Sequence, residues 1–343
     1  MTQVAANAEG NLATVVVVTW QGAHLLPACL DGLTAQRGPR ARFAVWVVDN
    51  ASTDGTAELL RTRYPWVRVL PNRDNQGFAG GCNLALREVS TPYAVLLNND
   101  ARPEPDWLDA LLAAFEPAVA ADVAAVTARV LLAGGATPGR INNAGNVVRS
   151  DGYAYDRGLG ASNGPPYDVP ADVFGFCGAS AALRMTALRQ VGLFADDFFL
   201  YYEDTDLSWR LRLAGWRVRY EPAAVVRHLH SASADQRSAL FAFHNERNRL
   251  LMLVRNAPAR IAVPQLLRFP VTTLLLSLRR WRGRPIPAGQ HFRPVLRLAV
   301  LRSVLRLLPT HLRQRWLIGR SAVLSRRDVA RQLEPAPVGR LHN

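Results

Sequence analysis

The segment "FAVWVVDNASTDGTAELLRTRYPWVRVLP", residues 43–71, predicts a strand, a helix and a second strand in succession. Its two ends are short apolar runs rich in β-branched residues, and the stretch between them is typical of a helix. The same alternation starts at "ATVVVVTW" (residues 13–20) and reaches "YAVLLNND" (residues 93–100). Buried strands that alternate with helices are typical of parallel sheets covered on both faces. We therefore expect an α/β fold, a doubly wound, mostly parallel sheet flanked by helices.

Polar side chains stand at the end of each predicted strand. They are Thr19, Asp49 with Asn50, Asn72, and the run Asn98, Asn99 and Asp100. Parallel sheets bind ligands at the carboxyl ends of their strands, so these side chains are candidate ligand-binding groups. A dinucleotide-binding domain would place several glycines after the first strand, but Gly22 stands there alone, which argues against that class. Asp49 has two interpretations: hydrogen bonding to a ribose or base, or capping of the turn "ASTDGT".

The composition is that of a globular chain, since 49% of the 343 residues are hydrophobic. Cys29, Cys82 and Cys177 fit neither a zinc nor a redox spacing, so we expect a reducing compartment and no disulfide. Residues 1–12 lack the basic start and the apolar core of a secretory signal peptide, and we expect them to be flexible.

The positive charge is concentrated in the C-terminal quarter. From Arg255 to the end, eighteen arginines stand against Asp328 and Glu334, a balance of +16 in a chain whose net charge is +14. No basic residue is a lysine, so the excess has two interpretations: a partner with negative charge, or a general bias toward arginine. Nucleic acid is not the expected partner, because aromatic residues are sparse in this region and no reading motif is present.

Several segments together resemble the bacterial family-2 glycosyltransferases, which have the GT-A fold, and in particular a subgroup with rhamnosyltransferases of cell-envelope assembly. The resemblance covers residues 13–256. Its segments are "VVVVTWQGAHLLPACLDGL", "VVDNASTDGT", "NRDNQGFAGGCNLAL", "LLNNDARPEPDWL" and "FGFCGASAALRMTALRQVGLFADDFFLYYEDTDLSWRLRLAGW".

The resemblance implies a nucleoside diphosphate sugar as ligand and Mg²⁺ or Mn²⁺ as cofactor, because a divalent cation neutralises the departing diphosphate. The implied donor-binding residues are Thr19, Asp49, Asn75, Asn98, Asn99, Asp100 and Arg247. The family's metal motif is Asp-x-Asp, whereas this chain has Asn98, Asn99 and Asp100, so Asp100 is the expected metal ligand.

A second metal ligand is expected in "VVRHLHSAS", where His228 and His230 would face the same side of an extended segment. Related enzymes use a histidine here, and we prefer His228, with His230 as the alternative. The segment "HNERNRLLMLVRN" (residues 244–256) resembles a further family segment, and it makes Arg247 and Asn248 candidates for phosphate contacts.

Three acids, Glu203, Asp204 and Asp206, stand at the start of the predicted helix in "YYEDTDLSWRLRLAG". Acids at that position stabilise a helix by capping it, which is one interpretation. The resemblance gives the other: Asp204 as the general base that removes a proton from the acceptor hydroxyl, with Glu203 orienting it.

Beyond residue 256 the chain predicts a basic, mainly helical region, residues 257–343, after a catalytic domain at 13–256. In "RLAVLRSVLRLLP", Arg302 and Arg306 fall on one helical stripe and Arg297 falls elsewhere. This pattern fits a helix lying on an anionic membrane surface, and it also fits helices packed on the catalytic domain with their arginines in water. Because Arg268, Pro264 and Pro270 interrupt the longest apolar run, we expect no membrane-spanning helix.

The sequence as a whole predicts an inverting glycosyltransferase, with L-rhamnose from dTDP-rhamnose as the leading donor and a lipid-linked or polysaccharide acceptor of cell-envelope glycan assembly. The alternatives are a UDP-sugar donor and an inactive scaffold that keeps the fold. We expect a cytoplasmic protein, peripheral on the inner face of the plasma membrane. The sequence predicts no oligomeric state.

Overall fold

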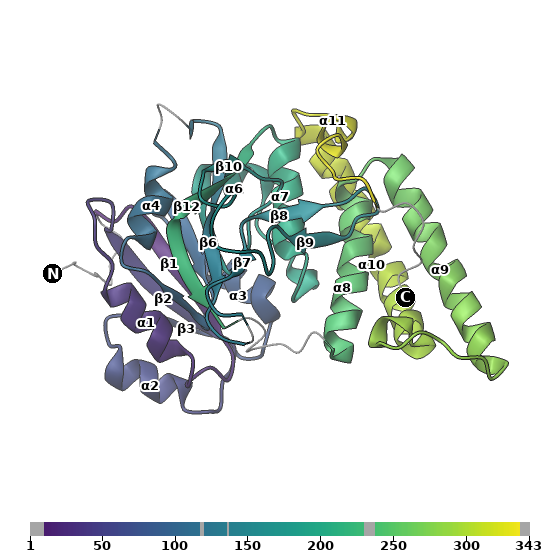
Figure 1. Cartoon of the computed structure of the whole chain (residues 1–343), viewed down its shortest axis with the longest axis horizontal. Helices are drawn as coiled ribbons and strands as arrows, with labels where there is room; N and C mark the ends of the chain where they lie inside the picture. The colour runs from purple at the N-terminus through teal and green to yellow at the C-terminus, as the bar shows by residue number, and fades with distance from the viewer. Residues whose placement is uncertain (1–9, 117–119, 136, 230–236, 337–343) are drawn as a thin grey trace.

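The computed structural model describes residues 10–116, 120–135, 137–229 and 237–336. A ten-stranded sheet forms its centre, with the main strand order β10-β12-β6-β11-β4-β1-β2-β3, β5 paired to β12 and β7 paired to β6. Helices pack on both faces of this sheet (Figure 1). The predicted α/β architecture is confirmed.

The first four strands are parallel, as predicted: β1 pairs with β2 and β4, and β2 pairs with β3. All seven side chains of β2 are buried, which explains why its sequence is an uninterrupted apolar run. The elements of this part are β1 (Ala13–Thr19), α1 (Leu26–Thr34), β2 (Phe43–Asp49), α2 (Thr56–Arg63), β3 (Arg68–Pro71), α3 (Gly77–Leu86) and β4 (Tyr93–Leu97).

The rest of the sheet mixes strand directions, which the alternation of strands and helices did not predict. Strand β11 is antiparallel to both β4 and β6 and so separates the first four strands from the parallel pair β6–β12. Strand β12 also pairs with β5, and its register sets His228 opposite Ala101, next to Asp100. The elements are β5 (Ala101–Pro103), α4 (Trp107–Ala113), β6 (Val123–Leu132), β7 (Ile141–Asn143), β10 (Ala171–Asp172), β11 (Ser180–Arg184), α6 (Met185–Val191) and β12 (Arg217–His228).

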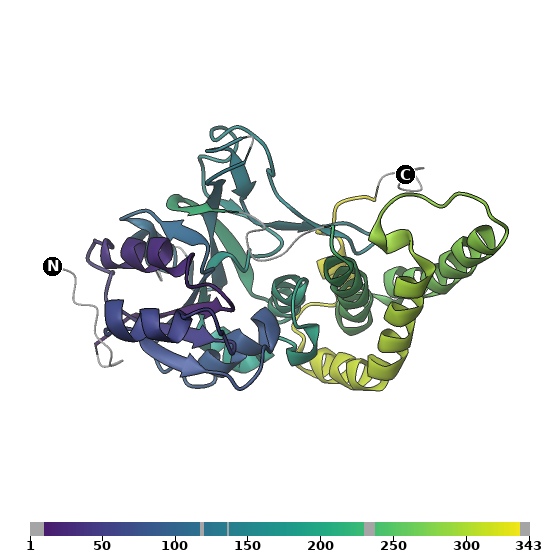
Figure 2. The same ribbon diagram turned by 90° about the horizontal axis from the view of Figure 1, so that it is seen from below.

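A mainly helical layer extends the molecule away from β3, and it includes α7 and the helices beyond α7 (Figures 1 and 2). Its elements are the hairpin β8 (Asn146–Val148) and β9 (Ala154–Asp156), η1 (Asp196–Phe198), α7 (Glu203–Leu213), α8 (Ala239–Asn256), α9 (Ala259–Trp281), η2 (Gln290–Phe292), α10 (Pro294–Ser321) and α11 (Arg326–Ala330). One apolar core joins Leu213 of α7, Leu251 of α8 and Val300 of α10. The C-terminal helices therefore pack on the same core as α7 and α8.

Helix α9 continues through Pro264 and Pro270 for 23 residues, so the residues that interrupt the apolar run do not end the helix. By length and composition it could cross a membrane, and only 17% of its most apolar 18-residue window is buried. A single helix of this kind is weak evidence for a span, and the described part of the chain holds no second one. That α9 does not span a membrane therefore stays a prediction.

Candidate active site

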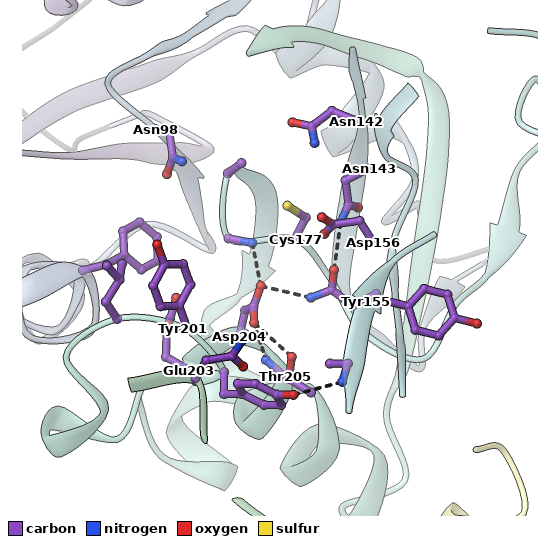
Figure 3. Close-up of a pocket in the computed structure, with 18 of the residues that line it drawn as sticks. Asn98, Asn142, Asn143, Tyr155, Asp156, Cys177, Tyr201, Glu203, Asp204 and Thr205 are labelled. Atoms are coloured by element: carbon purple, nitrogen blue, oxygen red, sulfur yellow. Dashed lines mark hydrogen bonds between the residues drawn. The ribbon is translucent and has the colours of Figure 1, made fainter. Parts of the chain in front are cut away.

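A cleft of about 340 Å³ opens where the carboxyl ends of β4 and β12 face the start of α7. In Figure 3, Asn98 and Asn142 lie along one side of it, and Glu203 and Asp204 lie along the other. The lining residues include Asn98, Asp100, Asn142, Asn143, Asn146, Asp156, Cys177, Tyr201, Glu203, Asp204, Thr205 and His228. Predicted residues from segments more than 100 positions apart thus meet in one cleft.

The loops after β1 and β4 are joined beside this cleft. Asn99 Nδ2 donates to Thr19 Oγ1 over 2.9 Å, and both side chains are buried. Gly22 lies directly over this hydrogen bond, so that a Cβ there would overlap Thr19 Oγ1 and lie 2.5 Å from Asn99 Nδ2. The lone glycine after the first strand is therefore required by a close approach of two loops.

Asp49, at the end of β2, caps the following turn, because its Oδ1 accepts from the Ser52 N–H over 3.0 Å. Asp54 completes the turn by accepting from the Ala23 N–H at 2.9 Å and the Thr56 hydroxyl at 2.6 Å. The capping interpretation of Asp49 is observed, and it leaves open the prediction that Asp49 also contacts a nucleotide.

Asp100 and His228 form the part of the cleft that suits a cation. His228 Nδ1 lies 2.7 Å from Asn142 Oδ1, and an amide oxygen can only accept, so Nδ1 donates. In the neutral ring Nε2 then carries the lone pair, and it lies 3.0 Å from Asp100 Oδ1. This oxygen is buried, and none of the described residues forms a hydrogen bond to it. Two electron-pair donors this close fit neighbouring ligands of one cation, which lie about 3 Å apart when each bond is about 2.1 Å.

The side chains that could bind a cation at this place carry little negative charge. Among the residues that the structure describes, no three His, Cys, Asp or Glu side chains form a metal-binding group. The third group near the pair is the amide of Asn98, whose Nδ2 lies 3.3 Å from His228 Nε2. His230 lies outside the described residues, so the choice between the two histidines remains a prediction.

Asp204, the second residue of α7, faces the cleft and accepts four hydrogen bonds (Figure 3). Oδ2 accepts from the Gly178 N–H at 3.1 Å and from Asn146 Nδ2 at 3.0 Å. Oδ1 accepts from the N–H and the hydroxyl of Thr205 at 2.6 and 3.1 Å. Burial nevertheless raises the pKa of Asp204 above its ordinary value. A fixed carboxylate with a raised pKa suits the removal of a proton from a hydroxyl.

Glu203 lies beside Asp204 but is in a different state. Its Oε2 is buried, and no residue that the structure describes forms a hydrogen bond with it. Burial, and after it the charge of Asp204, raise the pKa of Glu203 well above its usual range, which favours the neutral form of this carboxyl. The sequence predicted that Glu203 orients Asp204. Within the described part of the chain, Glu203 donates no hydrogen bond to Asp204. The Asp204 carboxylate is held by Gly178, Asn146 and Thr205.

Asp206, the third acid of the motif, is structural. It is fully buried, with Arg210 Nε and Arg255 Nε each 2.9 Å from its carboxylate and Asn256 Nδ2 at 2.7 Å. Burial alone would raise the pKa of Asp206, but Arg255 and Arg210 hold it below its usual value. The three acids therefore differ in role: Asp204 faces the cleft as a fixed carboxylate, the pKa of Glu203 is strongly raised, and Asp206 binds two buried arginines.

Comparison with known proteins assigns the family. The model described as glycosyl transferase family 2 matches residues 14–191. The N-acetylglucosaminyl-diphospho-decaprenol L-rhamnosyltransferase of Mycobacterium tuberculosis (strain H37Rv) is 31% identical over 250 residues, which cover 67% of this chain and 80% of that protein. The chain belongs to glycosyl transferase family 2. The predicted enzyme class, a glycosyltransferase, is thereby confirmed.

Two further likenesses agree with this assignment. The pre-mycofactocin glycosyltransferase of the same strain is 32% identical to this glycosyltransferase over 181 residues, 52% of this chain and 35% of that protein. A crystal structure of GalNAc-T7 with UDP, GalNAc and Mn²⁺ has a TM-score of 0.60 at 12% identity, covering 89% of this chain and 59% of that one. At this identity the second likeness shows the fold alone, and it confirms the predicted GT-A type.

Arg247 of this glycosyltransferase does not line the cleft. Its buried guanidinium donates to the main-chain carbonyls of Asp197 at 2.6 Å and Phe198 at 3.1 Å, and to Asn248 Oδ1 at 2.9 Å. The predicted contact with donor phosphates therefore gains no support, because the group is already bonded inside the protein. Asn75, another predicted donor residue, accepts from the Gly77 N–H at 2.9 Å in the turn before α3.

The sequence reasoning missed several residues that shape the cleft of the glycosyltransferase. Asn142 and Asn146, in "INNAGN" (residues 141–146), bond His228 and Asp204 respectively. Three asparagines within six residues were a visible signal. Gly178 acts through its main-chain N–H, and no side-chain pattern could have revealed it.

Proposed function

We propose that this family-2 glycosyltransferase moves a sugar from a nucleoside diphosphate, with dTDP-L-rhamnose as the leading donor, to a hydroxyl of a lipid-linked or polysaccharide acceptor, with inversion at the anomeric carbon. The observation that carries the proposal is the position of Asp204: a fixed carboxylate across one cleft from the Asn98–Asp100 turn and His228. The L-rhamnosyltransferase relative supports the choice of donor and of a lipid-linked acceptor.

The reaction requires one base and one departing diphosphate. The acceptor oxygen attacks the anomeric carbon while its proton passes to Asp204, a new C–O bond forms, and the bond to the diphosphate breaks with its electron pair staying on the phosphate oxygen. Asn146, Thr205 and the Gly178 N–H keep the Asp204 carboxylate oriented during the transfer.

Asp100 and His228 would hold a divalent cation, Mg²⁺ or Mn²⁺, with the Asn98 amide beside them. Such a cation neutralises the charge that develops on the diphosphate. The solved structure of GalNAc-T7 with UDP, GalNAc and Mn²⁺ supports both the cation and the alternative of a UDP-sugar donor.

A donor panel tests the proposal. Purified enzyme is given dTDP-rhamnose and a series of UDP- and GDP-sugars, with Mg²⁺ or Mn²⁺, and release of nucleoside diphosphate is measured with and without a polyprenyl-diphosphate-sugar acceptor. We expect one donor to be used, with the acceptor accelerating its consumption, and EDTA to stop the reaction. No turnover with any donor would favour the inactive scaffold, and full activity in EDTA would contradict the cation.

We also propose that the C-terminal helices attach the enzyme to the anionic inner surface of the plasma membrane. On α9, exposed apolar side chains recur every three or four residues, among them Leu267 (63% exposed), Leu274 (60%) and Trp281 (80%). Exposed arginines at 279, 280, 282 and 284 surround the end of this helix. An apolar stripe beside cationic side chains is what an interfacial helix presents to anionic lipid, and each nearby arginine contributes roughly 1 kcal/mol.

Paired substitutions test this attachment better than truncation, because α10 shares a core with α7 and α8. We expect Leu267→Asn with Leu274→Asn to reduce sedimentation with anionic liposomes. The matched control is Leu159→Asn with Val169→Asn, two side chains that are 53% and 55% exposed in the catalytic half. Binding should weaken at high salt and be absent with neutral liposomes. Equal sedimentation of both pairs would contradict the proposal.

A further inference from the structure

The main chain from Phe198 to Tyr202, directly before Glu203 and Asp204, has an unusual conformation. Phe199, Tyr201 and Tyr202 have φ values of 61°, 68° and 68°, in the left-handed region that side-chain-bearing residues rarely adopt. Such a conformation persists only where surrounding groups enforce it. Groups from helices α8, α10 and α3 hold this segment and the residue before it.

The side-chain amide of Asn248, in α8, forms hydrogen bonds with three main-chain carbonyls of this segment. Its Nδ2 lies 2.8 Å from the oxygen of Phe198, 2.9 Å from that of Leu200 and 2.7 Å from that of Tyr201, and the side chain is fully buried. Arg247 adds bonds to the carbonyls of Asp197 and Phe198, and its Nε donates to Asn248 Oδ1. Two adjacent side chains thus fix the carbonyls of four residues.

Helix α10 and helix α3 brace the same segment from other sides. Buried His311 of α10 places its Nε2 2.8 Å from Asp197 Oδ2. The Ala79 N–H of α3 donates to the Phe199 carbonyl at 3.2 Å, and a Cβ on Gly77 would overlap that carbonyl. The segment therefore has little freedom to change shape while α8 and α10 stay in place.

We propose that Arg247 and Asn248 are positioning residues for the catalytic segment, acting by holding residues 198–202 so that Asp204 enters the cleft in its reactive orientation. This inference rests on the proposed role of Asp204. The inference gives the helical layer a second role. The layer that contains α9, with its exposed apolar stripe, also contains α8 and α10, which hold the segment before Asp204. The inference replaces the phosphate contact predicted for Arg247, whose guanidinium lies behind the segment and outside the cleft.

The two roles of Arg247 predict opposite kinetics. Arg247→Met removes the bonds to the segment but keeps an apolar chain over the Phe243 ring, where the guanidinium now lies. A positioning role predicts that kcat per folded molecule falls about tenfold to a hundredfold, since small misplacements of a catalytic group have effects of this size, while the donor Kd from calorimetry changes by less than about twofold. A phosphate contact predicts weaker donor binding. Asn248→Ala should behave as Arg247→Met does.

Arg315→Met is the matched control. Arg315 of α10 also donates to main-chain carbonyls, those of Val254 and Ala257 at 2.8 and 2.7 Å, but these lie at the far end of α8. We expect this variant to keep wild-type kcat and Kd even if its melting temperature falls as far as in the other two. If Asn248→Ala does not fold, Arg247→Met carries the test, because it leaves the Asn248 amide in place.

Hydrogen exchange gives a readout that does not depend on catalysis. We expect amides of residues 197–204 to exchange about tenfold or more faster in Arg247→Met than in Arg315→Met. Equal exchange in the two variants, unchanged kcat in both segment variants, or a loss of donor affinity in Arg247→Met would each overturn the proposal. If the wild-type enzyme transfers no sugar from any donor, the proposed function fails, and exchange alone decides whether α8 holds the segment.

Discussion

The carboxyl edge of the first four strands and the helical layer around α7 and α8 use polar side chains in opposite ways. At the strand edge, Asn98 and Asp100 face a cleft, and within the described part of the chain Asp100 Oδ1 has no hydrogen-bond partner. In the helical layer, Arg210 and Arg247 are buried and donate to carbonyls of neighbouring loops. Asn98 and Asp100 at the end of β4 are therefore placed to meet a ligand, whereas these two arginines on packed helices are engaged inside the protein.

The arginines of the basic C-terminal region also fall into two groups, exposed ones and buried ones. Arg302 and Arg306 are exposed, as their shared stripe predicted, but Arg297 is buried between α10 and α9. Its guanidinium lies over the Phe269 ring and donates to Thr273 Oγ1 at 3.0 Å. The +16 balance therefore overstates the charge that a membrane would meet, because part of it fastens one helix to another.

The largest effect is expected where the two regions meet. Asp204→Asn removes the base but keeps the shape of the side chain, so turnover should fall by about 10² to 10⁴-fold with donor affinity nearly unchanged. Steady-state kinetics and calorimetric donor binding measure the two quantities. A variant with more than about a third of wild-type turnover would remove Asp204 from this role.

Within the helical layer, a large effect on stability should come with little effect on the donor site. Asp206→Ala leaves Arg210 and Arg255 buried without their counter-ion, a loss of about 3 to 5 kcal/mol in the free energy of unfolding. Urea denaturation measures it. Because the folded-state pKa of Asp206 is depressed, its contribution is present above the ordinary carboxyl pKa and is lost as pH falls through the lower folded value. A difference between wild type and variant that is constant down to the most acidic pH would contradict this linkage.

At the strand edge we expect the reverse, an effect on binding with little effect on stability. Asp100→Ala should abolish metal-dependent donor binding, and Asn98→Asp should tighten Mn²⁺ binding because it supplies a second carboxylate. Calorimetry with Mn²⁺ and nucleoside diphosphate measures both, and melting temperatures serve as the control. Unchanged Mn²⁺ affinity in both variants would place the cation elsewhere.

The smallest effect is expected at Glu203, next to the residue with the largest. Because the raised pKa of Glu203 favours its neutral form, Glu203→Gln should change the charge and size of this side chain little, and turnover should stay within about tenfold of wild type. The pH dependence of kcat should keep its acidic limb, since activity is lost as pH falls through the raised pKa of Asp204. A loss as large as that of Asp204→Asn would assign proton transfer to Glu203.

The sequence by itself determined the parallel part of the sheet and the polar groups at its edge. Strand period, strand length and the residues that follow each strand are local properties, and Thr19, Asp49 and Asp100 lie where they were expected. The start of α7 at Glu203 was visible for the same reason.

Only the tertiary structure decided which of these groups meet. The register of β12 on β5 brings His228 to Asp100, and Gly178 and Asn146 reach Asp204 across separations of 26 and 58 residues. Whether an arginine is solvated or buried was equally undecided, because helical spacing gives the side of a helix but not what packs against it. These contacts depend on strand order and helix packing, which are set by the burial of the whole core and not by any one segment.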